Sequence, residues 1–117
     1  MDRVMHGENF VAQEVNVIFV NNAMMKKIHR EYFQDYSVTD VISFRFNTGK
    51  NIDGEIYVCL DQSRRQAQFY KQTFTQETSR LILHGTLHLI GYDDATTKQR
   101  AAMKAKEDFY LQEFKKN

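Results

Sequence analysis

Two histidines, His84 and His88, lie four positions apart in a leucine-rich segment with helical spacing. Side chains at positions i and i+4 of an α-helix share one face, so the two imidazoles can reach the same ion. A buried imidazole needs a partner for each ring nitrogen, and a metal ion supplies one of them. This pair therefore predicts a helix that carries a metal site, and the rest of the fold has to be built around that helix.

The residues after His88 predict a third ligand. Gly91 is suited to end the helix and turn the chain back, and Asp94 follows His88 by six positions. The arrangement resembles the extended zinc-protease pattern, whose third ligand follows the turn glycine at this distance. We therefore expect His84, His88 and Asp94 to bind one divalent ion per chain, zinc, with Asp93 as a rival ligand one residue short of the spacing. Three protein ligands leave a coordination position for water, which is typical of a catalytic ion.

The residue after His84 argues against a peptidase. Zinc proteases with this helix place a glutamate there, which serves as general base. Here the position is Gly85, which has no side chain. The sequence therefore predicts a protease-like metal arrangement without peptidase machinery, and it leaves the general base unassigned.

The other apolar patterns predict three strands and about four to five helices. β-branched and alternating runs place strands at 16–20, 40–46 and 54–60, the last two antiparallel through a turn at 47–51. Helical spacing and capping residues place helices at 23–33, 62–71, 73–91 and from 96 or 97 to about 114. The third of these helices is expected to begin with a capping box formed by Thr73 and Gln76. Because strands come early and helices late, we predict a single α+β domain over 1–117, with a small mixed β-sheet.

Composition narrows the class of protein further. The longest apolar runs are too short to cross a membrane, and the first residues lack the apolar core of a signal peptide. Cys59 is the only cysteine, so no internal disulfide can form and we expect a cytoplasmic, reducing environment. The formal net charge of +1 means that a polyanionic partner would need a local basic patch.

The segment at 84–93 resembles the hallmark of the YbeY family of bacterial endoribonucleases. The resemblance extends to Thr-Asp-Val-Ile-Ser-Phe at 39–44 and Gly-Glu-Ile at 54–56, and it runs from about Val15 to the C-terminus. It implies a metal-dependent endonuclease that cleaves single-stranded RNA in ribosomal RNA maturation and ribosome quality control. Its implied partners are ribosomal RNA and components of the small ribosomal subunit.

The chain departs from the family pattern at three places. The usual third ligand is a histidine, where this chain has Asp94. Family members commonly carry an arginine before the Thr-Asp-Val strand; that place is Phe33 here, so the nearest arginine, Arg30, is the candidate for neutralising phosphate charge. Only about fourteen residues precede the first clear strand, so part of the family's first strand and helix is expected to be absent.

The resemblance also suggests a catalytic carboxylate. It places the strand that contains Glu55 near the family's catalytic cleft, which makes Glu55 a candidate general base. The alternative is that Glu55 is a solvated carboxylate on the strand with no catalytic role. Two other functions remain open. The same ligands would serve a metal hydrolase acting on a substrate other than RNA. A non-enzymatic ribosome-assembly factor could use zinc only to fix the turn, but structural zinc usually has a fourth protein ligand, and Cys59 is the only cysteine.

Overall fold

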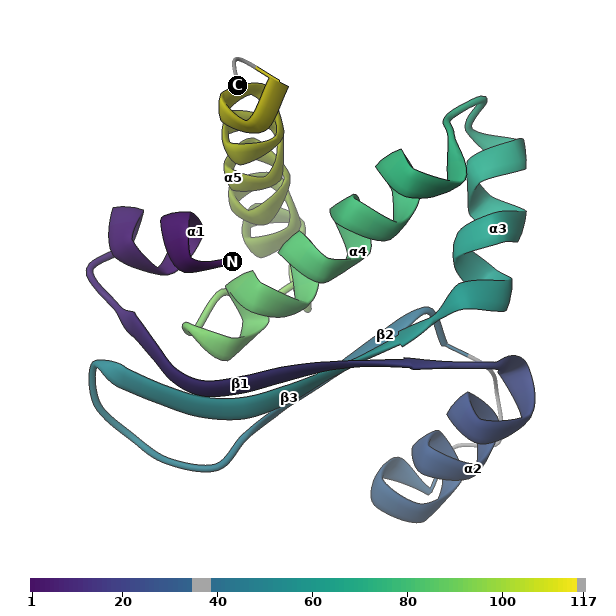
Figure 1. The fold of residues 1–117 in the computed structure, drawn as a ribbon, viewed down its shortest axis with the longest axis horizontal. Helices are drawn as coiled ribbons and strands as arrows, with labels where there is room; N and C mark the ends of the chain where they lie inside the picture. Colours follow the sequence, from purple (N-terminus) through teal and green to yellow (C-terminus); the bar gives the residue numbers. More distant parts are fainter. Residues whose placement is uncertain (35–38, 116–117) are drawn as a thin grey trace.

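The structure, a computed structural model, describes residues 1–34 and 39–115 and contains five helices and three strands there (Figure 1). None of the helices in this part of the chain is long and apolar enough to cross a membrane. In chain order the elements are α1 (Asp2–Gly7), β1 (Val11–Val20), α2 (Asn22–Phe33), β2 (Val41–Arg45), β3 (Asn51–Cys59), α3 (Leu60–Phe69), α4 (Phe74–Leu89) and α5 (Thr97–Lys115). The predicted α+β class is confirmed.

The three strands form a mixed sheet in the order β1-β3-β2. β3 pairs with β2 in antiparallel register and with β1 in parallel register, so the predicted antiparallel pair is confirmed. The first strand is longer than predicted, because it begins at Val11 and α1 precedes it. Gln13, Glu14 and Asn16 are exposed polar residues of this edge strand, and its pairing with β3 is irregular between Ala12 and Glu14. The first half of the strand therefore lacks an apolar strand pattern.

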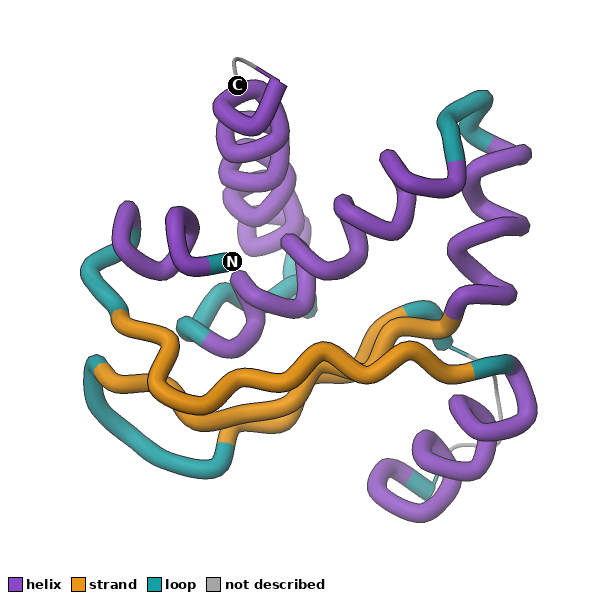
Figure 2. The backbone as a smooth tube through the Cα atoms, in the orientation of Figure 1, coloured by secondary structure: helices purple, strands orange, loops and turns teal. Residues whose placement is uncertain are grey.

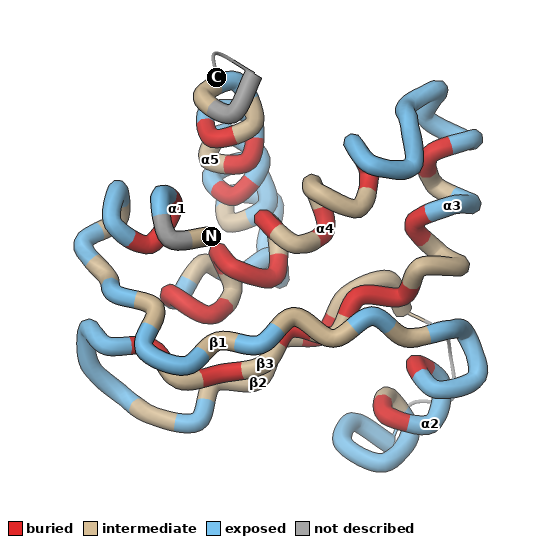
Figure 3. The backbone as a smooth tube through the Cα atoms, viewed as in Figure 1, coloured by how far each residue is buried: buried red, intermediate tan, exposed pale blue. Residues whose placement is uncertain are grey.

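The helices cover the two faces of the sheet unequally. Figure 2 shows α4 crossing one face with α1, α3 and α5 on the same side, whereas α2 lies on the other side. The main core forms between β3 and α4, where Ile52, Ile56, Leu81 and Leu87 are almost fully buried (Figure 3). The C-terminal half of α4 is therefore held against the sheet, while its N-terminal end lies beside α3 (Figure 1).

Both ends of α4 are capped by hydrogen bonds between residues close in sequence. Thr73 and Gln76 form the predicted capping box, in which each side chain accepts a hydrogen bond from the other residue's backbone N–H. At the C-terminal end Gly91 has a backbone φ of +107°, a conformation that residues with a side chain rarely adopt. The N–H groups of Gly91 and Tyr92 donate to the carbonyls of His88 and Leu87, which is the Schellman pattern. This turn directs the chain back along α4 toward Asp94.

Gly85 lies where α4 packs directly against β2 and β3. A Cβ atom at this position would lie 2.6 Å from Ile56 Cγ2 and 3.0 Å from Ser43 Oγ. Ser43 Oγ also donates a 2.8 Å hydrogen bond to the Gly85 carbonyl. The absence of the protease glutamate at this position therefore has a packing reason, because any side chain here would separate the helix from the sheet.

We expect Gly85→Ala to lower the free energy of unfolding by about 1–3 kcal/mol, the usual cost of overpacking. In an unhindered helix the same substitution would raise the free energy of unfolding by about 1 kcal/mol. The sign of the change therefore shows whether a Cβ atom at position 85 meets the sheet. Urea unfolding of metal-free protein measures it. In an Ile56→Ala background, which removes the opposing methyl group, Gly85→Ala should cost clearly less. A stabilising effect in the wild-type background would contradict the contact.

Candidate metal centre

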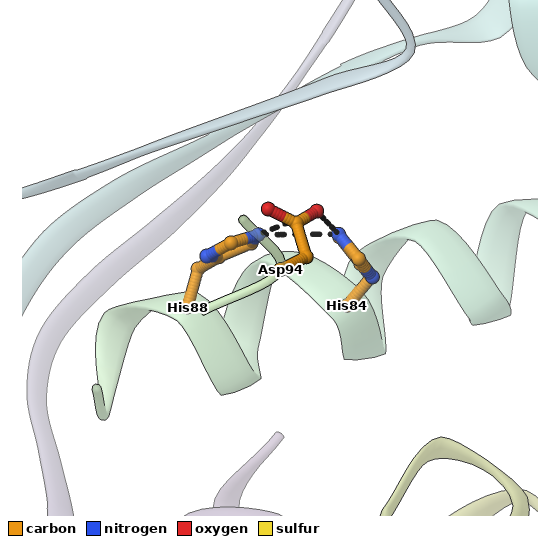
Figure 4. A group of neighbouring side chains, drawn as sticks. All are labelled: His84, His88 and Asp94. Carbon is orange, nitrogen blue, oxygen red and sulfur yellow. Dashed lines mark hydrogen bonds and ion pairs between the residues drawn. The ribbon is translucent and has the colours of Figure 1, made fainter. Parts of the chain in front are cut away.

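The site is built on one face of α4 and on the turn that follows it. His84 and His88 lie one helical turn apart, and their Nε2 atoms are 3.2 Å from each other. The Oδ2 atom of Asp94 lies 3.4 Å from Nε2 of His84 and 3.6 Å from Nε2 of His88 (Figure 4). The sequence prediction named these three residues, and the structure brings one ligand atom of each together.

The three distances fit a small divalent ion. Zinc binds imidazole nitrogen and carboxylate oxygen at about 2.0–2.2 Å in tetrahedral geometry, which places neighbouring ligand atoms about 3.3–3.5 Å apart. The three ligand atoms have this spacing within a few tenths of an ångström. The donor set of two nitrogens and one oxygen also suits zinc, while manganese and related ions remain compatible with it.

The open side of the group faces solvent. The side chain of Asp94 is 45% exposed, and both histidines are partly exposed. Cys59, the only cysteine, lies buried at the end of β3, where its Sγ donates to Asn22 Oδ1 at 3.2 Å. It takes no part in the group, so the described residues leave a position where water or a substrate oxygen can bind an ion.

Asp93, the rival ligand, has a different role in the turn. Its Oδ1 accepts a 3.0 Å hydrogen bond from the backbone N–H of Asp94. Its carboxylate therefore stabilises the turn, and Asp94 is the residue that joins both histidines in the candidate ligand group.

Glu107 on α5 stands behind His84, and sequence reasoning did not assign it a role in the site. Its Oε1 lies 3.5 Å from Nδ1 of His84, and Arg80 on α4 contacts the same oxygen at 3.5 Å. Burial lowers the pKa of His84, but the hydrogen bond and charge of Glu107 and the charges of Asp94 and Asp40 outweigh it and raise that pKa. A carboxylate behind a ligand histidine favours the tautomer whose Nε2 lone pair faces the ion.

We expect Glu107→Gln to weaken metal binding about 10- to 100-fold, the usual effect of losing a carboxylate behind a ligand histidine. The amide keeps the shape of the side chain but removes its charge. Competition with a chromophoric chelator measures the affinity. Asp108→Asn is the matched control, because Asp108 is an exposed neighbour on α5 that pairs with Lys104 instead. Equal affinities in the two variants would show that Glu107 does not support His84.

Glu8 connects the turn after α4 to α5 through hydrogen bonds. It accepts hydrogen bonds from Tyr92 on the turn at 2.7 Å, from Lys106 on α5 at 3.1 Å and from Tyr110 on α5. Burial raises the pKa of Glu8, but the hydrogen bonds from Tyr110, Tyr92 and Lys106 and the Lys106 charge lower it further than burial raises it. Because Tyr92 adjoins the segment that carries Asp94, this carboxylate helps to fix the position of the third ligand.

The lowered pKa of Glu8 predicts a pH-dependent contribution to stability. Its stabilising effect is present above the pKa of the unfolded chain, and it is lost as pH falls through the lower folded-state value. At about pH 7, Glu8→Gln should therefore reduce the free energy of unfolding by about 1–3 kcal/mol. The difference from wild type should shrink toward about pH 3. Urea unfolding across this range measures it, and exposed Glu14→Gln is the control; a constant difference would refute the assignment.

The two predicted catalytic residues lie away from the three ligands. Glu55 faces the side of the sheet that α2 covers, in a hollow shared with Tyr57, whose hydroxyl donates to it at 3.1 Å. Its neighbour Ile56 faces α4, and strand alternation turns Glu55 the other way. Arg30 is an exposed residue of α2 and does not line the hollow beside His88. The structure brings neither residue to the metal group, and it places Arg45 of β2 in that hollow instead.

The fold and the site together define a class of protein. Two histidines one turn apart, a carboxylate returned by a glycine turn and an open coordination side on an α+β scaffold are the features of a metal-dependent hydrolase.

The comparisons with known proteins give the particular family. The family model "Endoribonuclease YbeY" matches residues 1–115. A Chloroherpeton thalassium protein named Endoribonuclease YbeY is 39% identical over 95% of this chain and 79% of its own length. A Chlorobium luteolum protein of the same name is 38% identical over 97% and 82%. A solution structure from Thermotoga maritima is 29% identical with a TM-score of 0.69, covering 96% of this chain and 74% of its own. The chain therefore belongs to the endoribonuclease YbeY family.

Proposed function

We propose that this chain cleaves single-stranded RNA with a zinc ion bound by His84, His88 and Asp94, and that it acts in ribosomal RNA maturation and ribosome quality control. One observation carries the proposal: three ligand atoms with tetrahedral spacing lie on the family's signature helix and turn, with one side open to solvent. An open three-ligand group favours catalysis over the purely structural zinc of an assembly factor.

Each residue has a defined task in this proposal. A bound zinc ion would polarise a phosphoryl oxygen and lower the pKa of water. His84 and His88 would bind the ion through Nε2, and Glu107, whose Oε1 lies 3.5 Å from Nδ1 of His84, would hold that ring in position. Asp94 supplies one negative charge, and the turn fixed by Gly91 and Asp93 holds its carboxylate over the helix.

The experiment compares substrates under metal control. Zinc-loaded protein should cleave a single-stranded oligoribonucleotide, leave the matching duplex and a casein substrate intact, and lose activity with a chelator. His6→Ala, which changes an exposed histidine on α1, should leave cleavage unchanged. Peptidase activity, or cleavage of RNA that persists at full rate without metal, would overturn the proposal.

The cellular role needs a separate measurement. In cells whose own copy is replaced by the His88→Ala variant, ribosomal RNA with unprocessed ends should accumulate, and the His6→Ala variant should restore normal ends. Normal ends in both strains would refute the role in maturation while leaving the RNA cleavage activity standing.

A further inference from the structure

A hollow of about 300 Å³ opens beside His88, at the edge of the sheet formed by β2. α2 contributes His29 and Phe33 to its lining, β2 contributes Ser43 and Arg45, and α4 contributes His88. α2 and α4, which both contribute to this lining, lie on opposite sides of the sheet (Figure 1), and β2 is the edge strand between them. Whatever occupies it lies against one of the candidate metal ligands.

One wall of the hollow is aromatic. The ring of Phe33 is stacked near Phe44 with centroids 6.1 Å apart and planes 20° apart, and His29 lies 5.3 Å from it. Phe33 is nevertheless 51% exposed, so its neighbours support the ring without covering it. A supported, half-exposed ring is the form of surface on which an unpaired base stacks.

The other wall carries a positive charge. Arg45 donates to the carbonyls of Leu89 and Gly49, which are uncharged acceptors. Its Nε atom is buried and has no hydrogen-bond partner among the described residues. No carboxylate in the described part of the chain forms an ion pair with it. The guanidinium is thus oriented by backbone contacts while its charge is available to an anion.

We propose that this hollow is a nucleotide subsite for the RNA substrate, in which a base stacks on Phe33 and a phosphate of the same strand contacts Arg45. The inference rests on the proposed function and deepens it, because it names the part of the substrate that this surface binds. It also gives a physical reason for a single-strand preference. A base can stack on Phe33 only when it is not paired within a duplex.

The alternative is that both side chains only pack α2 and the end of α4 against β2. The two possibilities differ in RNA binding without metal. Fluorescence anisotropy with a labelled single-stranded oligoribonucleotide, on metal-depleted full-length protein, measures this binding without cleavage. Phe33→Leu should bind about 5- to 100-fold more weakly than wild type, and Phe33→Trp should retain binding. Phe69→Leu, at an exposed ring on α3, is the matched control and should bind normally.

The salt dependence separates the two contacts. Arg45→Gln should reduce the slope of log affinity against log salt by about 0.7, the contribution of one phosphate contact to a single strand, and Arg45→Lys should retain it. Phe33→Leu should leave the slope unchanged. With zinc-loaded protein both loss variants should raise KM more than they lower kcat. Arg64→Gln, an exposed arginine on α3, is the control for charge.

The outcomes distinguish the subsite from the proposed function. Wild-type protein that neither binds nor cleaves single-stranded RNA would refute the proposed function itself. Wild-type protein that cleaves RNA, with Phe33→Leu and Arg45→Gln binding as tightly as their controls, would overturn the subsite alone. If Arg45→Gln fails to fold, as thermal unfolding would reveal, the comparison of Phe33→Leu with Phe69→Leu decides.

Discussion

His84→Ala and His88→Ala are each expected to abolish stable metal binding and RNA cleavage together. The two Nε2 atoms lie 3.2 Å apart, so either substitution removes one of three ligand atoms from the group. The loss of affinity should exceed the about 10- to 100-fold caused by losing a partner behind a ligand. Because a bound ion contributes several kcal/mol of transition-state stabilisation, cleavage should fall by at least about 100-fold.

Elemental analysis of the purified variants and single-turnover cleavage assays measure the two losses. The His6→Ala variant should keep wild-type metal content and rate, because His6 is exposed on α1. Thermal unfolding of metal-free protein shows whether the variants fold, since both histidines are only partly buried. One equivalent of zinc retained in both alanine variants would refute the site.

The metal helix and its turn were predictable because their signals are local. The capping box at Thr73 and Gln76, the histidine spacing and the glycine turn all depend on residues a few positions apart. The structure confirms the capping box, and Gly91 adopts the backbone conformation for which a glycine is needed. The order of strands and helices was enough to predict the α+β class, which the structure also confirms.

The supporting residues were not predictable, because their contacts join distant parts of the chain. Glu8 meets Tyr92 across eighty-four positions and Tyr110 across one hundred and two. Glu107 reaches His84 only because α5 packs beside α4. α1 has six residues and no side-chain cap, so it carries little sequence signal.

Glu55 shows why the sequence alone does not place a strand carboxylate relative to the candidate metal site. Alternation predicts that Glu55 and Ile56 point to opposite faces, but not which face α4 covers. In the structure α4 covers the face of Ile56. Arg45 was missed for a related reason. In the sequence it is one polar residue of an alternating strand, and nothing there indicates a binding role. Only the structure places it beside Phe33 and the end of α4.

Asp94→Ala should weaken metal binding by more than about 100-fold and leave the fold intact. The carboxylate is the only ligand in the described group that lies outside α4, and its side chain is 45% exposed. Its removal takes away a charged ligand but disturbs no core contact. Asp93→Ala is the matched control; it should lower the affinity less, because the Asp93 carboxylate bonds the turn backbone instead of the ligand group. Zinc content measured in both variants tests the assignment, and a loss that follows Asp93 alone would mean that the ligand set must be redrawn.

Asp94→His should restore zinc binding and change the chemistry in a defined direction. Carboxylate oxygen is a harder donor than imidazole nitrogen, so the natural site should accept manganese or magnesium more readily than the variant does. The carboxylate also leaves the centre one charge less positive than three neutral imidazoles would, and a less positive centre acidifies water less. The rate of RNA cleavage should therefore rise at lower pH in Asp94→His than in wild type, with metal preference measured separately by competition binding. An unchanged metal preference together with an unchanged pH profile would show that Asp94 does not contribute its charge to the centre.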